Sequence, residues 1–348
     1  MSAKIHINLD KFKKNVEFLT DKLHESNINV FAVSKVFCAE KPLIDILNNC
    51  EIAGIADSRI LNLKKIKSNK PKMLLRIPAI SEVSDVIEYA DISLNSEIAV
   101  IRELNDFAKR KNVIHKIILM IDLGDLREGI YFNDFDYNII NEIRNLKNIK
   151  LLGIGTNLTC YGAVIPTKQT YELLNEIKNN IEKMYKIKLE VISGGNSSSI
   201  YLLDGKIPDF INQLRIGEGF VLGRETAFGR NIEGMHDDIF TLEVEIIELK
   251  NKPTIPFGEI GVDAFGRKLK YVDKGIIKRA ILNIGKQDVS CEYLIPPKGV
   301  NIIGSSSDHL IVEIVSGKYG IGDKIVFKLN YGGILGLMTS SYVEKVYE

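Results

Sequence analysis

The stretch from Asn29 to Leu43, NVFAVSKVFCAEKPL, joins an apolar strand to a helix through a lysine. Residues 30–33 are apolar and β-prone, which is typical of a buried strand. Lys35 stands at the carboxyl end of this strand, and a helix is predicted over about 41–49. Burying a lysine is costly unless its ammonium is paired or takes part in chemistry. The stretch therefore predicts one strand–helix unit and makes Lys35 a candidate functional residue.

The same strand-then-helix order continues over the first two-thirds of the chain. Further apolar strands are predicted in EIAGIA, KMLLRI, DISL, HKIILMID, IKLLGIG, KLEVIS and INQLRIG. Helices are expected from an Asp10 cap to about His24, after Asp57, from about Ser81, from Ser96 to about Lys111, from about Asp134, over about 167–187 and from about Ser197. Without the opening strand KIHINL, about eight strands each precede a helix or loop, which predicts a (β/α)8 TIM-type barrel. A doubly wound sheet is the competing architecture and would need fewer strands and a topological switch.

The pattern changes after about Arg230. Strands separated by short Gly, Asp and Lys turns are predicted in IFTLEVEIIELKN, RKLKYVDKG, KRAILNIGK, VNIIGSSSDHLIVEIVSG and DKIVFKLNYGG. The 348 residues are enough for a barrel and a smaller domain. We therefore expect an α/β barrel over residues 1–230 and a C-terminal mostly-β domain over 231–348. The opening strand, at about 4–9, is a candidate for either domain.

Composition narrows the class of partner. Hydrophobic residues make up 45% and charged residues 26% of the chain, and the net charge is +1. This balance is typical of a soluble globular protein and gives no electrostatic footprint for nucleic acid. The four cysteines lack CxxC spacing, so neither a metal site nor a disulfide framework is predicted. We see no signal peptide and no long apolar run, so a cytoplasmic protein with a small-molecule partner and no membrane partner is expected.

Polar residues follow the predicted strands where barrel enzymes carry their chemistry. They are Lys35 after the first strand, Asp122 and Arg127 in IDLGDLREG after the fifth, Thr156 and Asn157 in GIGTNL after the sixth, SGGNSSS after the seventh, and RIGEG after the eighth. The glycines of SGGNSSS let the backbone approach a phosphate, and Ser197 and Ser198 stand where the next helix begins. A strand-end lysine opposite a phosphate cradle predicts pyridoxal phosphate, whose aldehyde forms an imine with a lysine.

Each feature taken singly also has a structural explanation. Lys35 alone fits a structural or surface lysine, and Asp122 with Arg127 fits a loop ion pair. A Gly/Ser loop alone is most often a turn. The prediction therefore depends on several polar strand ends occurring in one barrel.

With these motifs, the sequence resembles the alanine racemase-like, fold-type III pyridoxal phosphate enzymes over nearly its whole length. INLDKFKKNV resembles the family's opening segment, VFAVSKV the strand before the Schiff-base lysine, and IDLGDLREG the Asp-x-Gly-x-x-Arg-x-Gly segment. The resemblance implies that Lys35 holds the cofactor and that Arg127 lies near the cofactor's phenolic oxygen and the substrate carboxylate. It also implies a homodimer in which IIGSSSDHLIVEI and LNYGG complete the partner subunit's site.

The same resemblance supplies the cofactor-binding set. Its members in this chain are Lys35, Arg127, Asn157, Asn196, Ser197, Ser198, Arg215, Gly217, Glu218 and Tyr331. Tyr331 is expected to reach the phosphate. The resemblance points to Arg215 opposite the pyridine nitrogen, where an arginine disfavours protonation of the ring, and Glu218 is the competing residue.

Four departures argue against an alanine racemase. Ala39 replaces a phosphate-binding tyrosine, Asn157 replaces a histidine, and Met120 stands where relatives carry a modified lysine that orients their arginine. The catalytic tyrosine is replaced by Lys286 in IGKQDV. Because racemisation needs a second acid/base on the opposite face of the substrate, Lys286 or Asp288 of the partner subunit is the candidate.

The overall pattern, including SKVFC, DLGDLREG and GKQDV, is similar to ornithine racemases and their close relatives. We therefore expect an isomerase that interconverts L- and D-ornithine or a similar basic amino acid. Ser307 is small enough to leave room for a long substrate side chain, and Asp308 would pair with its distal ammonium, although Asp308 also suits a turn. One alternative is a decarboxylase of basic amino acids, but such relatives carry cysteine where Ser307 stands. The other is a non-catalytic pyridoxal phosphate carrier, which generally lacks the C-terminal domain.

Overall fold

The computed structural model describes residues 3–203, 207–268 and 270–348, which form two compact units. One unit covers residues 10–237, and the other joins the N-terminal segment through Leu9 to residues 238–348. The chain therefore changes unit at Asp237, later than the expected position of 230, and the opening strand lies in the second unit.

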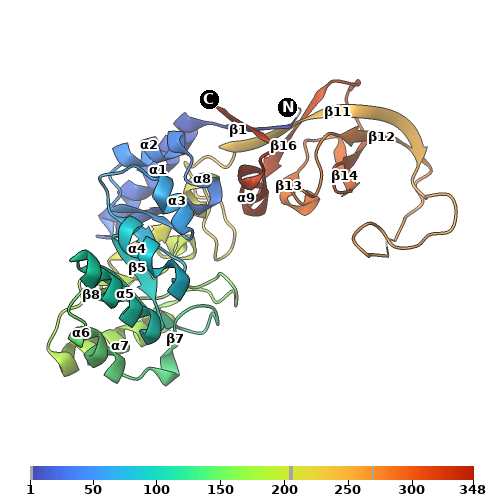
Figure 1. Cartoon of the computed structure of the whole chain (residues 1–348). Coiled ribbons are helices and arrows are strands. Elements are labelled where there is room, and N and C mark those ends of the chain that lie inside the picture. Colours follow the sequence, from blue (N-terminus) through green and yellow to red (C-terminus); the bar gives the residue numbers. More distant parts are fainter. Residues whose placement is uncertain (1–2, 204–206, 269) are drawn as a thin grey trace. The chain divides into compact units, whose positions relative to one another are not determined.

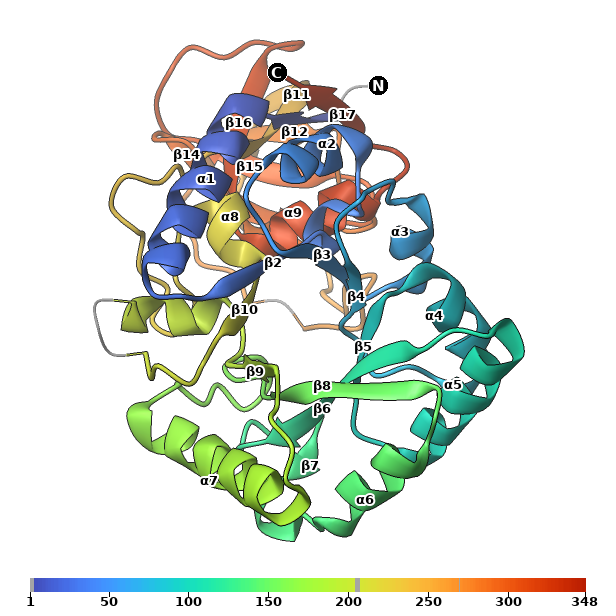
Figure 2. The ribbon, with the colours of Figure 1, turned by 90° about the vertical axis from the view of Figure 1, so that its left-hand side faces the viewer.

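The first unit is a closed barrel of parallel strands, seen end-on in Figure 2. Within the described residues its eight ring members are β2 (Asn29–Val33), β3 (Gly54–Asp57), β4 (Lys72–Leu74), β5 (Ile92–Asn95), β6 (His115–Asp122), β8 (Ile149–Gly155), β9 (Val191–Ser193) and β10 (Gln213–Ile216). The two-residue β7 (Ile130–Tyr131) pairs only with β6 in this part of the chain. Because β10 returns to pair with β2, the ring has no edge, which confirms the barrel and excludes the doubly wound sheet.

Helices surround this ring (Figure 2). They are α1 (Leu9–Glu25), α2 (Lys41–Asn49), α3 (Ile60–Lys65), α4 (Val83–Tyr89), α5 (Ile98–Lys111), α6 (Asn138–Asn145), α7 (Lys168–Tyr185) and α8 (Glu218–Leu222), with a 3-10 helix at Ser197–Leu202. Asp10 lies inside the first turn of α1 and is not its cap. Asp57 ends β3, and its carboxylate accepts the Arg59 N–H in the turn before α3, so the helix expected after Asp57 begins at Ile60. No helix of the described ranges is long and apolar enough to cross a membrane.

The barrel interior is filled by side chains from successive strands. This core cluster comprises Phe31, Ala56, Met73, Ile92, Leu94, Ile118, Met120 and Leu152. The strands approach closely beside it, since a Cβ on Gly153 would lie 1.7 Å from the Val191 carbonyl oxygen. Asn15 joins α1 to the end of this unit: its side-chain N–H groups donate to the Phe220 and His236 carbonyls at 3.1 and 2.8 Å. The packed interior leaves the strand ends as the place for chemistry.

The second unit is a mostly antiparallel sheet (Figure 1). Its elements are β1 (Ala3–Ile7), β11 (Phe240–Pro253), β12 (Ile276–Leu282), β13 (Leu294–Ile295), β14 (Val300–Ser305), β15 (Leu310–Ile314), β16 (Lys324–Leu329), α9 (Tyr331–Thr339) and β17 (Glu344–Tyr347). The long β11 pairs with β1, β16 and β12. This architecture confirms the expected C-terminal β domain.

One local prediction for this unit is wrong, and one helix was missed. Residues 267–268 and 270–275 form no strand, because Asp263 accepts the N–H groups of Phe265 and Arg267 and folds the segment into a turn. The helix α9 was not predicted at all. Its start is set by Asn330, whose side chain accepts the Gly333 N–H, while Gly332 lies against the Tyr293 ring, which a Cβ would approach to 2.8 Å.

Candidate active site

Lys35 lies two residues beyond the end of β2, in a 3-10 turn at Lys35–Phe37. The preceding Ser34 is buried, and its Oγ donates to Asp57 Oδ2 at 2.6 Å, which fastens the turn to the end of β3. Burial raises the pKa of the Asp57 carboxyl, although its hydrogen bonds and the charge of Lys35 oppose that shift. Lys35 is half-buried on a turn whose position two neighbouring strands fix.

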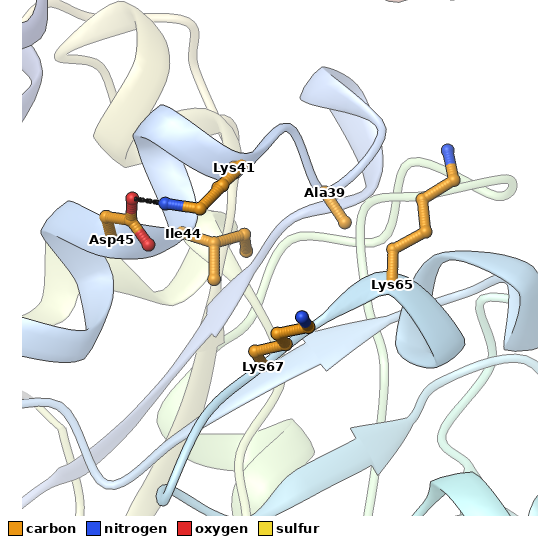
Figure 3. A pocket seen from close by; sticks show the side chains of 6 residues that line it. All are labelled: Ala39, Lys41, Ile44, Asp45, Lys65 and Lys67. Atoms are coloured by element: carbon orange, nitrogen blue, oxygen red, sulfur yellow. Dashed lines mark hydrogen bonds and ion pairs between the residues drawn. The ribbon is translucent and has the colours of Figure 1, made fainter.

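Ala39 stands where the resembling family has a tyrosine, and it offers no hydrogen-bond donor. Its backbone is left-handed, with φ of 53°. Its side chain lines a pocket of about 120 Å³ with Lys41, Ile44, Asp45, Lys65 and Lys67, shown in Figure 3. Lys41 pairs there with Asp45. A phosphate bound at the barrel mouth would therefore depend on groups other than residue 39.

Arg127 is carried on a tight loop after β6. Asp122 Oδ1 accepts the Gly124 and Leu126 N–H groups at 2.8 and 3.2 Å, so this carboxylate shapes the loop. Gly129, with φ of +126°, lies against the Asp122 backbone, which a Cβ would approach to 2.5 Å. Arg127 pairs with Glu128, so the alternative of an Asp122–Arg127 loop ion pair is wrong.

Arg215 on β10 is buried at the ends of β9 and β8. Its guanidinium donates to Ser193 Oγ through Nη1 and to the Thr156 carbonyl through Nη2 at 2.7 Å. Burial lowers the pKa of Arg215 to about 10. Glu218, the competing residue, is bound instead by Arg224, whose Nε donates to Glu218 Oε1 at 2.8 Å. The guanidinium of Arg215, and not the Glu218 carboxylate, is thus fixed across the strand ends.

The loops after β8 and β9 meet at Asn196, and the segment after β10 joins them at Ser197. Its Nδ2 donates to Asn157 Oδ1 and to the Leu158 carbonyl at 2.9 and 2.8 Å, and its Oδ1 accepts the Ser198 N–H at 2.8 Å. Ser197 Oγ accepts the Gly219 N–H at 3.0 Å. The structure therefore brings together the predicted residues Asn157, Asn196, Ser197 and Ser198.

This mouth has the donors that a phosphorylated, ring-bearing ligand requires. Among the described residues, Asn157 Nδ2 and Thr156 Oγ1 are buried without a hydrogen-bond partner. Gly217 sits where a Cβ would lie 3.1 Å from Val33 Cβ, so the β10 turn approaches β2 closely there. Orphaned donors, serine hydroxyls and a buried guanidinium suit an anion beside an aromatic ring. Together with Lys35, this donor set fits pyridoxal phosphate.

The remaining candidate residues lie in the β unit. There the segment of Lys286 is hydrogen-bonded to the segment of Ser307 and Asp308. The Lys286 and Gln287 N–H groups donate to the Ser306 and Ser307 carbonyls, both at 3.0 Å. A Cβ on Gly285 would lie 2.3 Å from the Asp308 nitrogen, so glycine is required where the two segments cross. Lys286 and the Ser307–Asp308 segment are thus neighbours.

The side chains of these candidates differ in exposure and partners. Lys286 Nζ lies 3.8 Å from the Phe265 ring centroid. Asp288 is buried and accepts from Ser340 Oγ at 2.7 Å, whereas Asp308 is exposed. The hydroxyls of Ser306 and Ser307 lower the pKa of Asp308. Tyr331 begins α9 in this same unit.

The sequence gives no role to several residues that support the site. Tyr171 of α7 donates to the Gly194 carbonyl at 2.6 Å and so holds the glycine-rich loop. Asp125 accepts N–H groups of Cys160, Tyr161 and Val164, which joins the loops after β6 and β8. Ser193 and Glu128 bind the two arginines. Ser193, Asp125 and Glu128 stand at strand ends, which was the available signal, whereas Tyr171 gave none.

Comparison with known proteins adds a full-length likeness to this geometry. Residues 7–224 match the family described as alanine racemase, N-terminal domain. The chain is 48% identical to an ornithine racemase of Acetoanaerobium sticklandii, over 99% of both chains. It is 38% identical to a lysine racemase of Thermotoga maritima, over 98% of this chain and 97% of the relative. An alanine racemase structure from Bartonella henselae, with covalently bound pyridoxal phosphate, matches with a TM-score of 0.74 at 16% identity and covers 100% of both chains.

Proposed function

This chain belongs to the alanine racemase family, and on that premise we propose that it is a pyridoxal phosphate-dependent racemase of ornithine. The observation that carries the proposal is the 48% identity to an ornithine racemase over the full length. The lysine, two arginines and phosphate-type loop at one end of the barrel supply the groups that such a reaction needs.

Pyridoxal phosphate, when bound, draws electrons from the substrate Cα and makes its proton removable. Lys35 would hold the cofactor and would carry the substrate Cα proton on one face. Ser197, Ser198 and Asn196 would hold the phosphate, and Arg215 would serve the pyridine nitrogen. Arg127 binds the substrate carboxylate. Arg215, already fixed by two hydrogen bonds, is a guanidinium and would not give the pyridine nitrogen the proton that a carboxylic acid would.

Lys286 of the partner subunit is the proposed acid/base on the opposite face. Asp288 suits this task less well, because it is buried and already bound by Ser340. The Phe265 ring lies against the Lys286 ammonium and holds the side chain in place. Racemisation in both directions then uses Lys35 on one face and Lys286 on the other.

The distal ammonium of the substrate is assigned to Asp308, which is exposed beside Lys286's segment. The small Ser307 leaves room for the side chain. Lysine is the second candidate substrate, because the 38% identical relative is a lysine racemase. One methylene changes discrimination by about 1–3 kcal/mol, so we expect a preference between the two amino acids and not exclusion of either.

The decisive experiment incubates the cofactor-loaded enzyme with L-ornithine in D2O. Optical rotation, deuterium at Cα and released CO2 are followed together. Loss of rotation with Cα deuterium and no CO2 is the expected result. CO2 with putrescine would assign a decarboxylase instead, and an unchanged substrate would leave lysine to be tested before a carrier role is considered.

Asn196 offers a test of the phosphate site. Replacing it by alanine removes the bonds to Asn157, Leu158 and Ser198. These bonds order the loop that carries Ser197 and Ser198, and each neutral bond contributes about 0.5–1.5 kcal/mol, so the cofactor Kd should rise about 10–100-fold. Absorbance titration of the apoenzyme measures the change, with Asn180→Ala on the outside of α7 as the control. Unchanged affinity in a folded Asn196→Ala protein would contradict the assignment.

A homodimer is inferred from the family and from an apolar segment of the β unit. The segment between β11 and β12 extends away from the sheet (Figure 1). Its exposed apolar side chains are Ile255, Phe257, Ile260, Val262, Phe265, Tyr271 and Val272. Exposed apolar side chains gathered in this way are typical of protein interfaces.

Phe257, which is fully exposed, is the residue to change. Because buried aromatic anchors contribute about 2 kcal/mol or more, Phe257→Ser should weaken the dimer about 30-fold. Light scattering over a dilution series measures this, with Leu61→Ser on α3 as an exposed apolar control. A monomeric wild-type protein, or equal dissociation of both variants, would refute the interface.

A further inference from the structure

Glu128 has no assigned role, yet its carboxylate is bound to the guanidinium of Arg127. Both Glu128 oxygens take part, one with Nε and the other with Nη2 at 2.6 Å. The Glu128 side chain is 18% exposed and that of Arg127 is 43% exposed. Burial lowers the pKa of Arg127, but the bond to Glu128 and the charges of Cys160, Glu128 and Asp125 together outweigh it, so the pKa is raised overall. A two-point contact of this kind fixes the plane of the guanidinium.

The loop that carries the pair leaves little freedom to either residue. Leu126 is left-handed with φ of 56°, and Gly129 lies against the backbone of Asp122. Asp125 ties the same loop to the segment after β8 through three backbone N–H groups. Arg127 and Glu128 therefore lie on a short loop that hydrogen bonds to Asp122 and Asp125 hold in place.

No other carboxylate of the described residues forms an ion pair with Arg127. Asp122 and Asp125 are engaged by backbone N–H groups. Met120, in the strand before the loop, is buried and uncharged. Glu128 is also one of the charges that act on Arg215. A single carboxylate thus faces two cationic groups at the barrel mouth.

We propose that Glu128 is a positioning residue of this site, which orients Arg127 for the substrate carboxylate and offsets the charge of Arg127 and Arg215. The inference rests on the proposed function. A basic amino acid carries two ammonium groups, and two uncompensated arginines would repel it. Glu128 therefore favours binding of a cationic substrate as well as the correct direction of the arginine.

Kinetics give the first test. Glu128→Gln keeps the shape and removes the charge, so kcat for ornithine should fall about tenfold and KM should rise. KM for L-ornithine should rise more than the inhibition constant of L-norvaline, a neutral amino acid of the same length. Glu128→Asp should restore part of both values. Unchanged constants, or a lower KM, would overturn the proposal, since a lower KM means that Glu128 competes with the substrate.

Chemical modification gives a test that does not need turnover. Phenylglyoxal should modify Arg127 several times faster in Glu128→Gln than in the wild-type holoenzyme, as mapped by mass spectrometry, because the guanidinium loses its shield. Arg102, which pairs with Glu142 on the outer helices, is the matched control: Glu142→Gln should expose Arg102 and leave Arg127 unchanged. Equal Arg127 rates in wild type and Glu128→Gln would overturn the proposal. A wild type that does not racemise ornithine would refute the proposed function, while the modification rates would still decide the role of Glu128.

Discussion

Replacing Lys35 by alanine is expected to lower racemisation by on the order of 10⁴-fold or more, because loss of an essential covalent residue has effects of that size. The variant loses both the covalent attachment of the cofactor and the proton carrier on one face. It should still fold, since Ser34 and Asp57, which fix the turn, remain in place. Polarimetry with L-ornithine and the visible absorbance of the bound cofactor measure the two losses.

Lys41→Ala is the matched control for this prediction. Lys41 lies six residues further on, and its ammonium pairs with Asp45 at the pocket of Figure 3. Its replacement removes a lysine from the same segment without touching Lys35. Both activity and the absorbance of the attached cofactor should stay near wild-type values. If Lys35→Ala retained the attached cofactor, another lysine would hold it and the assignment would be wrong.

Replacing Lys286 by alanine is expected to reduce racemisation by about 10²–10⁴-fold, the usual contribution of one general acid/base. Lys35 remains, so one enantiomer of ornithine should still exchange its Cα proton with D2O without inverting. This separation of exchange from inversion is the signature of a second base lost on one face. Chiral chromatography with mass spectrometry follows both processes in one sample.

Two further variants make this prediction specific. Lys278→Ala, on β12 of the same unit, removes a lysine whose ammonium lies 3.5 Å from the Tyr319 carbonyl and should leave activity unchanged. Asp288→Asn should retain most activity, because the Asp288 carboxylate accepts a hydrogen bond from Ser340. If Lys286→Ala racemised ornithine at the wild-type rate, Lys286 would not be the second acid/base. If Asp288→Asn instead showed exchange without inversion, the second acid/base would be Asp288.

The sequence determined the barrel and the order of its candidate residues. Alternation of apolar strands and amphipathic helices is a local property, because each element buries one face and the spacing of apolar residues records it. The position of a residue at a strand end follows from the same pattern. The sequence pattern alone therefore places Lys35, Arg127, Asn157, Asn196 and Arg215 at strand ends.

The tertiary structure alone decided which groups pair. Arg215 binds the Thr156 carbonyl 59 residues away, and Asp288 binds Ser340 52 residues away. Arg127 binds its neighbour Glu128 because the loop is folded back by Asp122 and Gly129. The direction of a side chain and its partners across strands depend on register and loop closure, which local spacing does not encode. For that physical reason the sequence named the residues of the mouth, and only the folded chain assigned their hydrogen bonds and charges.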